Sequence, residues 1–567
     1  MELVWEFFYL SFVFGSDIMF LVIFGLKLKQ MIVEKLKKII LEKIQNLYEE
    51  LDFSLAEIEL LEAPEKLGDY SCNVAMKLAG RLKKKPIEIA EEIRNKMLFE
   101  RGIKEFKKIE VAVPGFLNFF LADDYLVNEI GKINMAKLEY ASSKKNQGRK
   151  IHLDFVSANP TGPIHIGNSR GGPFGDVLAK VWEKTGYQVH REYYVNDFGN
   201  QIKVLGDSIL KNENAQYKGS YIDELNKKYK NSEEDSFTIG QKATAEILEN
   251  FIKPSMKKLG IEFDEYFSEK SLHESGAIDK VFERLNEKGL LYQEDGAVWF
   301  RAKNFGDEKD RVIRKSTGEV TYFGGDIAYH QNKVDRGFDR LVDIWGCDHH
   351  GDIKRLLGVA KALGFDDKIE IIITQMVKFI KGGKEFRMSK RKGEYVTIDD
   401  LLKEVGLDAV RFFFLMFDYN SQMVFDLDLA KEKSDKNPVF YVQYAYARIQ
   451  SILRKAKQAG LTMNQNILID NETENTFLKE EKERALIVHL TKFPFLVNEI
   501  SEKYNVHQLV WYVIKLADKF HSFYHQCQVI DEKNEILTKQ RLALVNATSN
   551  IFLEALNLLG VSAPEKM

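Results

Sequence analysis

The chain has few cysteines and few prolines, and each scarcity argues against a class of protein. Its 567 residues include three cysteines, Cys72, Cys347 and Cys527, which form no Cys-x-x-Cys pair. We therefore expect neither a disulfide framework nor a structural zinc site. Only 10 prolines and the lack of a low-complexity tract argue against long disordered linkers. Isolated cysteines suit a reducing compartment, so we expect a cytoplasmic protein.

Neither sign of charge dominates the sequence. Lys and Arg number 82 against 85 Asp and Glu, which gives a net charge of −3 at pH 7. A nucleic-acid partner would therefore be held by local Lys/Arg patches and not by bulk charge. Hydrophobic residues make up 45% and charged residues 29% of the chain, as in soluble globular proteins, and the length allows three or four domains.

An apolar stretch from Leu3 to Leu26 opens the chain and permits two interpretations. About 20 apolar residues would span a membrane, which would give a membrane-anchored version of the protein. Against that, Glu6 and Asp17 are costly in lipid, and a signal peptide would begin with positive charge. We therefore expect residues 1–30 to be a spurious or disordered leader, with Met31 as the true initiator and no membrane partner.

Two short segments more than two hundred residues apart carry the strongest functional signal. Residues 157–168 read Ser-Ala-Asn-Pro-Thr-Gly-Pro-Ile-His-Ile-Gly-Asn and lie between a strand-like run at 151–156 and a helix-like run at 175–185. Residues 387–393 read Arg-Met-Ser-Lys-Arg-Lys-Gly. In the first segment Pro and Gly stop the strand from continuing, and the Gly after the His lets backbone and ligand approach closely.

The strand–loop–helix context of the first segment suits nucleotide chemistry. The following helix would point its N–H groups and partial positive charge at the loop, where a triphosphate would lie. Phosphoryl chemistry spreads charge over phosphate oxygens, and fixed donors stabilise that charge without a covalent nucleophile. His165 can supply one donor and Lys390 a positive charge. Alone, each segment could be an ordinary loop histidine or a solvated basic turn, but the pair in this order favours a site.

Together the two segments resemble the HIGH and KMSKS signatures of class I aminoacyl-tRNA synthetases. Asn168 replaces the last His of the first signature and Arg387 the first Lys of the second, whereas Lys390 is retained. Over about residues 31–567 the chain resembles arginyl-tRNA synthetase in particular. The segments that carry this narrower resemblance are Asp154–Pro163, Tyr193–Gln201, Tyr322–Asp326, Trp345–Gly351, Phe440–Ala445 and Val561–Met567.

The resemblance implies four sets of site residues. The catalytic set is His165, Gly167, Asn168 and Lys390. The ATP set is Pro163, His165, Gly167, Asn168, Gly346, Asp348, His350, Met388, Ser389 and Lys390. The arginine set is Asp154, Ser157, Asn159, Tyr322 and Asp326, and the tRNA set is Tyr441, Tyr444 and Arg448, with Tyr446 as a further aromatic beside them. No residue is expected to bind a metal; Mg²⁺ is expected with the ATP phosphates.

The arginine set also makes chemical sense from its residue types. A guanidinium is a planar fork of donors, and its pocket needs a carboxylate with further acceptors. Tyr322 and Asp326 are four residues apart, so they share a face if the stretch is helical. The alternative is that Asp326 only caps a helix. For Asn196 to Gln201, orienting the substrate and capping the next helix stay equally open.

Adjacent acidic and histidine residues at 348–350 also permit a metal interpretation. Two neighbouring histidines on a strand point to opposite faces, which argues against a shared ion. The family resemblance instead places this segment near the ribose and adenine of ATP.

The expected fold class is α/β. A Rossmann-like parallel-sheet catalytic domain at 123–434, with an insertion at about 210–300, follows an N-terminal α+β domain at 31–122 and precedes a C-terminal all-α helical bundle at 435–567. The resemblance assigns the N-terminal domain to the tRNA elbow and the bundle to the anticodon. Expected helices are 32–51, 86–97, 175–185, 438–457, 480–502, 506–527 and 535–559, and expected strands are 109–113, 116–121, 151–156, 188–195, 341–345 and 369–375.

Strands that alternate with helices predict a parallel sheet, whose ligands gather beyond the carboxyl ends of the strands. Four segments follow strand-like runs and are expected to converge there: the His165 loop, Tyr322–Asp326, Gly346–His350 and the Lys390 loop. The function implied is that of a monomeric arginine–tRNA ligase acting on ATP, L-arginine and tRNA(Arg). Two alternatives remain, a class I synthetase for another amino acid and an inactive tRNA-binding paralogue.

Overall fold

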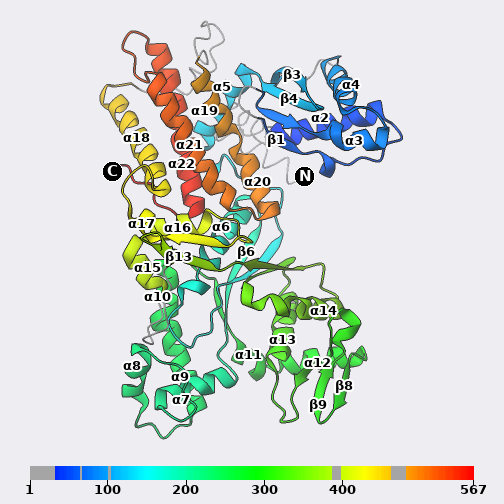
Figure 1. The fold of residues 1–567 in the computed structure, drawn as a ribbon, viewed down its shortest axis with the longest axis vertical. Coiled ribbons are helices and arrows are strands. Elements are labelled where there is room, and N and C mark those ends of the chain that lie inside the picture. Colours follow the sequence, from blue (N-terminus) through cyan, green and yellow to red (C-terminus); the bar gives the residue numbers. More distant parts are fainter. Residues whose placement is uncertain (1–31, 64–66, 100–103, 386–396, 462–479) are drawn as a thin grey trace, which may run out of the picture. The chain divides into compact units, whose positions relative to one another are not determined.

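The structure is a computed structural model that describes residues 32–63, 67–99, 104–385, 397–461 and 480–567 (Figure 1). The chain forms two compact units. The first consists of residues up to 143 with 453–495 and 519–551, and the second of 144–452, 496–518 and 552–567. The C-terminal helices contribute residues to both units, and each unit is described by itself.

The N-terminal part of the first unit is a four-stranded antiparallel sheet with helices, as the α+β prediction requires (Figure 1). The strand order is β1-β2-β4-β3. Its elements are α2 (Ile32–Leu47), β1 (Leu60–Glu62), β2 (Tyr70–Cys72), α3 (Val74–Leu82), α4 (Pro86–Phe99), β3 (Phe106–Ala112), β4 (Phe116–Leu121) and α5 (Asp123–Ala136). Helix α2 buries Val33, Leu36, Ile40 and Ile44, which recur every three or four residues.

The second unit is built on a five-stranded parallel sheet in the order β12-β11-β5-β6-β7. Its strands are β5 (Lys150–Phe155), β6 (Gln188–Val195), β7 (Glu265–Ser268), β11 (Arg340–Gly346) and β12 (Ile369–Thr374). In chain order, β6 and β7 are added on one side of β5, and β11 and β12 are then added on its other side. The sheet therefore has its topological switch point between β5 and β11, where ligands of such sheets bind.

Two features of this sheet differ from the sequence prediction. Strand β7 lies inside the stretch 210–300 that was expected to be an insertion, yet it pairs with β6 as the fifth parallel strand. Helix α6 (Gly171–Lys184) begins four residues earlier than predicted, because Pro173 lies in its first turn, where a missing N–H costs no hydrogen bond. Gly175 in α6 packs on β5 so closely that a Cβ there would lie 2.5 Å from the Phe155 ring.

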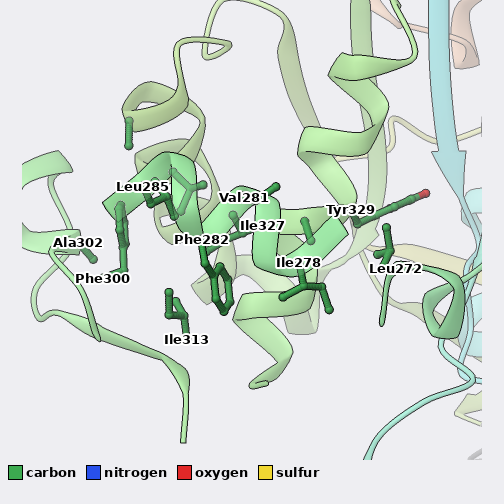
Figure 2. Packing of buried hydrophobic residues seen from close by; sticks show 13 residues of the cluster. Leu272, Ile278, Val281, Phe282, Leu285, Phe300, Ala302, Ile313, Ile327 and Tyr329 are labelled. Carbon is green, nitrogen blue, oxygen red and sulfur yellow. The ribbon is translucent and has the colours of Figure 1, made fainter. Parts of the chain in front are cut away.

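A separate antiparallel sheet, in the order β10-β9-β8, carries an apolar cluster of this unit (Figure 2). The cluster joins α12 and α13 to this antiparallel sheet through Phe282, Phe300, Ile313 and Ile327. It therefore fixes α13, whose first two turns carry two of the predicted arginine-binding residues. The elements are α11 (Glu269–Glu274), α12 (Ala277–Glu287), β8 (Leu291–Glu294), β9 (Ala297–Phe300), β10 (Arg311–Arg314), α13 (Tyr322–Asp335) and α14 (Ile353–Leu363).

The other elements of the chain are mostly helical. They are α7 (Asn200–Leu210), α8 (Ser220–Tyr229), α9 (Ser236–Ile247), α10 (Lys253–Lys258), β13 (Val377–Lys381), β14 (Lys384–Glu385), α15 (Ile398–Val405), α16 (Leu407–Leu415), β15 (Met423–Asp426), α17 (Leu427–Lys431), α18 (Pro438–Gln458), α19 (Glu481–Thr491), α20 (Phe493–Lys503), α21 (His507–Gln526) and α22 (Glu535–Leu559). The predicted all-α C-terminal region is confirmed, but the helix expected at 480–502 is two helices. The second begins at Phe493, and Pro494, which lacks an N–H, is tolerated in its first turn.

Helix α22 is the one helix among the described residues that is long and apolar enough to cross a membrane by length and composition. Of its most apolar window, 72% is buried inside the protein. Buried apolar helices of this length are common in protein cores, so the helix gives no support to a membrane interpretation.

Candidate active site

The loop after β5 leaves the sheet through two strained residues. Val156 and Ser157 have φ values of 69° and 35°, in the left-handed region that a β-branched residue rarely adopts. The Ser157 hydroxyl donates to Asp154, at the end of β5, and accepts from the backbone N–H of Tyr194 at 3.0 Å. These bonds hold the sharp turn that aims the loop away from the strand. Strained backbone of this kind is typical of functional sites.

His165 lies on this loop, and one of its ring nitrogens already accepts a hydrogen bond. Its Nδ1 accepts the backbone N–H of Gly167 at 3.0 Å. The neutral ring therefore carries its proton on Nε2, which can donate to an oxygen such as that of a phosphate. Gly167 and Asn168 are exposed in the short 3-10 turn that follows, immediately before α6. Pro163, just before His165, is half-buried.

The His165 loop contacts the residues that follow the second signature segment, although these are far apart from it in sequence. His165 forms an antiparallel bridge with Thr397, and the N–H of Ile398 donates to the carbonyl of Ile164 at 3.0 Å. Thr397 then caps α15 by accepting from the N–H of Asp400. Met388, Ser389 and Lys390 themselves lie outside the described residues, so their roles stay predictions. The anchored end at Thr397 is seven residues after Lys390, within reach of the first loop.

Arg170 is a supporting residue that the sequence analysis missed. It is 3% exposed, and its guanidinium donates to the carbonyls of Gln375, Ser421 and Asp418 at 2.7 to 2.9 Å. Burial lowers its pKa to about 10, against the opposing charge of Asp418, so it stays cationic at neutral pH. It thus ties the start of α6 to the segment after β12. No local pattern distinguishes such an arginine from a surface one.

The segment 346–350 follows β11, on the other side of the switch point from the His165 loop. The two histidines lie in a 3-10 helix, Cys347–Asp352, so the argument that neighbouring strand residues point to opposite faces does not apply to them. Asp348 and His350 are exposed, and His349 lies 6.0 Å from the Trp345 ring, centroid to centroid. The parallel pairing of β11 with β5 places this segment beside the first loop, as its predicted role at ATP requires.

The described residues contain one cluster of metal-type side chains, and it lies elsewhere. His190, Glu192 and Glu265 have ligand atoms within 4.8 Å of one another. Arg336 fills this cluster, since its guanidinium donates to Glu192 at 2.6 Å and Glu265 at 2.8 Å and lies 2.9 Å from Nε2 of His190. A cation of the protein therefore takes the place that an ion would need.

Tyr322 and Asp326 lie in the first turns of α13, so the predicted helix is confirmed and the two residues share a face. The cap of α13 is Thr321, whose hydroxyl accepts from the N–H of Gly324 at 3.2 Å. The alternative that Asp326 is only the cap is therefore wrong. The preceding strand, β10, belongs to the antiparallel sheet β10-β9-β8. The expectation that this pair follows a strand of the parallel sheet is therefore wrong.

Polar side chains from the residue after β6 and from α7 contact Tyr322. The Tyr322 hydroxyl accepts from the amides of Asn196 and Gln201, the latter at 3.2 Å. Asn196 and Gln201 thus contact a predicted arginine-binding residue. Asp197 instead accepts from the hydroxyl of Ser268 and the N–H of Lys270, and Gly199 precedes α7. The sequence left open whether these residues orient the substrate or cap the next helix. Gly199 is the N-cap of α7, whereas a substrate-orienting role for the two amides stays a prediction.

Glu269 is a second carboxylate beside Asp326 that the sequence analysis did not identify. It is 7% exposed, and its Oε2 has no hydrogen-bond partner among the described residues. Burial raises the pKa of Asp326 to about 7; the charge of His330 opposes this rise, and that of Glu269 adds to it. Two neighbouring carboxylates, of which Glu269 has an oxygen without a partner among the described residues, form an environment that a guanidinium can complete.

Asp154 is less available to bind arginine than predicted, because both of its carboxylate oxygens already have hydrogen-bond partners. Its Oδ1 accepts from Ser157, and its Oδ2 accepts from the Tyr329 hydroxyl at 2.9 Å and Lys333 at 3.2 Å. Asp154 would therefore influence arginine binding indirectly, by holding Ser157. The Asn159 side chain is exposed on the loop, where it can reach a ligand.

The predicted tRNA residues lie along α18. Tyr444 is 40% exposed, and Arg448 lies over its ring at 4.7 Å and donates to its hydroxyl at 2.7 Å. Tyr441 is half-buried and donates to Asp518 at 2.7 Å. Tyr446 is 5% exposed and belongs to the core, so the expectation that it contacts bases is wrong.

Comparison with known proteins accounts for nearly the whole chain. Residues 27–121 match the arginyl tRNA synthetase N terminal domain, 129–432 the catalytic domain of class I (R) tRNA synthetases, and 442–567 the DALR anticodon binding domain. The arginine–tRNA ligase of Bacillus velezensis is 43% identical over 531 residues, which cover 90% of this chain and 94% of that protein. That of Bacillus subtilis is 42% identical over the same shares. The chain belongs to the arginyl-tRNA synthetase family.

Solved structures of the family share the fold. The arginyl-tRNA synthetase of Plasmodium falciparum aligns with a TM-score of 0.75 at 22% identity, covering 95% of this chain and 99% of that one. That of Thermus thermophilus aligns with a TM-score of 0.71 at 20% identity, covering 95% of this chain and all of that one. The family resemblance and the α/β fold class expected from the sequence are thereby confirmed.

Proposed function

We infer that this chain is an arginine–tRNA ligase, which activates L-arginine with ATP and transfers it to tRNA(Arg). The observation that carries this function is identity of about 40% to arginine–tRNA ligases over 90% of the chain. The pocket of Asp326, Glu269 and Tyr322 supports the choice of amino acid. It offers two desolvated carboxylates, which suit a guanidinium better than the point charge of a lysine.

The first step would join arginine to AMP. The arginine carboxylate attacks the α-phosphorus of ATP, the bond to the β-phosphate bridging oxygen breaks, and pyrophosphate leaves. The Nε2–H of His165 and the ammonium of Lys390 are assigned to the phosphate oxygens, where charge grows in the transition state. Mg²⁺ would arrive with the ATP phosphates and add positive charge there.

The second step would transfer the arginyl group to tRNA. A hydroxyl of the terminal ribose attacks the acyl carbonyl, its proton is lost, and AMP leaves with the electron pair of the broken bond. No covalent enzyme intermediate is required, because the held geometry and electrostatics lower the barrier. Tyr444 and Arg448 on α18 are assigned to the tRNA, where an exposed ring can stack on a base. We also propose that the enzyme acts as a monomer in the cytoplasm.

Pyrophosphate exchange tests this function directly. Purified protein is assayed with arginine, lysine and glutamine separately, with and without total tRNA. Exchange that depends on arginine, followed by charging of tRNA(Arg), is the expected result. Exchange with lysine or glutamine would assign the chain to another class I specificity. Binding of tRNA without any exchange would identify an inactive paralogue.

A further inference from the structure

Two tyrosine hydroxyls hold the loop after β5 on either side of Asn159. The hydroxyl of Tyr193, on β6, donates to the carbonyl of Ala158 at 2.7 Å. The hydroxyl of Tyr221, on α8, donates to the carbonyl of Thr161 at 2.9 Å. Asn159 lies between these two carbonyls in the sequence, and its side chain is exposed. The segment that carries this predicted arginine-binding residue is therefore fixed at both of its ends.

The chain between Asn159 and the Tyr221 contact forms a tight turn. The N–H of Thr161 donates to the carbonyl of Asn159 at 2.8 Å, and the carbonyl of Thr161 accepts from the Tyr221 hydroxyl. Pro160 is buried between them, and its ring restricts the backbone because it fixes φ. A movement of the Thr161 peptide would therefore be passed on directly to Asn159.

Tyr221 also fills the space next to Gly162. A Cβ on Gly162 would lie 2.8 Å from the Tyr221 hydroxyl oxygen and 3.0 Å from Cζ of the same ring. Gly162 does not have a positive φ, so the close approach of Tyr221, and not the backbone conformation, requires a glycine there. The hydroxyl and the end of the ring both contact the loop, so the contact depends on this side chain.

Tyr221 lies in the first turn of α8, and neighbouring helices hold it in place. Its ring packs edge to face on that of Phe251, with centroids 6.3 Å apart. Phe251 belongs to a five-residue π-helix, Leu248–Ile252, that follows α9. Further along α8, the amide of Asn226 donates to the carbonyl of Ile209 on α7 at 2.6 Å. Single π-helical turns of this kind are frequent at functional sites.

The helical pair α7 and α8 reaches a second predicted arginine-binding residue. The amide nitrogen of Gln201, in the first turn of α7, lies 3.2 Å from the Tyr322 hydroxyl. Helix α8 belongs to the stretch at about 210–300 that the sequence presents as an insertion, and no motif there identifies Tyr221. The pair thus contacts both the Asn159 loop and Tyr322, which gives part of this stretch a role at the site.

We propose that Tyr221 is a positioning residue, whose hydroxyl holds the loop so that Asn159 can bind arginine. The proposal rests on the proposed function and deepens its arginine site. His165 has an anchor of its own, because the carbonyl of Ile164 accepts from the N–H of Ile398. Loss of the Tyr221 hydroxyl should therefore affect arginine binding and leave the phosphate contact of His165 in place.

The test is Tyr221→Phe, which removes the hydroxyl and keeps the ring. Pyrophosphate exchange with tRNA present gives kcat and the KM values for arginine and ATP. The net contribution of one hydrogen bond corresponds to a change of about 2- to 12-fold in an equilibrium constant. Displacement of the loop adds to this loss, so the KM for arginine should rise about tenfold. The kcat and the KM for ATP should stay near their wild-type values.

A double-mutant cycle with Gly162 tests the contact itself. Gly162→Ala places a methyl group against the Tyr221 hydroxyl, so it should displace the tyrosine and raise the KM for arginine by a similar factor. Because both changes break one contact, the double variant should raise this KM no more than the stronger single variant. Tyr229→Phe is the matched control, since it removes a hydroxyl that donates to Glu246 at the other end of α8. It should leave the KM for arginine unchanged.

Each contrary outcome has a distinct meaning. A Tyr221→Phe protein that melts lower but keeps the wild-type KM for arginine would overturn the proposal and leave Tyr221 a packing residue. Equal rises in the KM for arginine and for ATP, or effects that multiply in the double variant, would also overturn it. If Tyr221→Phe does not fold by circular dichroism, Gly162→Ala alone decides, because the same selective rise is required of it. Wild-type protein that exchanges pyrophosphate with another amino acid and not with arginine would instead refute the proposed function.

Discussion

Replacement of Asp326 by Asn should weaken arginine binding and stabilise the arginine-free protein at the same time. The first effect follows from loss of the charge that pairs with the guanidinium. Removing one partner of a buried ion pair typically costs about 3–5 kcal/mol, which corresponds to an increase in the KM for arginine of two or more orders of magnitude. The KM for ATP should stay within a few fold.

The second effect follows from the pKa of Asp326 in the folded protein. It is raised from 3.8 to about 7, mainly by burial. Ionisation of a carboxyl with a raised pKa destabilises the folded protein; the penalty is absent below pH 3.8, grows from there, and is complete above pH 7. A difference of about three pKa units corresponds to about 4 kcal/mol, as an upper estimate. Asn is neutral at every pH and avoids this penalty.

The measurement is a pair of thermal melts without arginine, at pH 8 and pH 5, together with arginine-dependent charging of tRNA. At pH 8 the variant should melt a few degrees above the wild type, and at pH 5 this gap should shrink because the wild-type carboxyl is then mostly protonated. A variant that melts lower at both pH values would show that Asp326 is not strained in the empty pocket. A near-wild-type KM for arginine would place the guanidinium site elsewhere.

Three further predictions use other parts of the chain. His165→Ala should slow pyrophosphate exchange about 10²–10³-fold with little change in arginine affinity, and near-normal exchange would contradict its role. Gly175→Ala should destabilise the protein by about 1–3 kcal/mol in thermal or urea unfolding, because its Cβ would overlap the Phe155 ring. Gly131→Ala is the matched control, since a Cβ in that helix meets nothing within 4 Å. Tyr444→Ala should lower tRNA affinity in filter binding while the KM for ATP stays constant.

The sequence predicts the parallel sheet well because its strands and helices carry local signals. Four predicted strands, including 188–195, and three of the four long C-terminal helices recur with boundaries shifted by a few residues at most. Strand β7 was missed because it is only four residues long, Glu-Tyr-Phe-Ser, and lies between helices. Such a strand is specified by its pairing with β6, which is a long-range contact and leaves no period in the sequence.

The residues of the candidate site also fall into two groups, those with a local sequence signal and those defined only by long-range contacts. Motif spacing identifies His165, Tyr322 and Asp326, because each lies in a segment with a recognisable pattern. Arg170 and Glu269 were missed because their roles depend on carbonyls and carboxylates supplied by distant elements. Before folding, each is an ordinary charged residue beside a helix, so composition and periodicity cannot separate it from surface residues.

The relation between the two signature segments shows what folding adds to a motif. In the sequence, residues 157–168 and 387–393 are linked only by their resemblance to family signatures. In the structure, His165 forms a bridge with Thr397, which lies four residues after the second segment ends at Gly393. A change in the backbone at Thr397 would therefore alter the loop of His165, with no substitution at either signature. The His165 loop shares backbone hydrogen bonds with residues 397 and 398, and that coupling cannot be read from either segment alone.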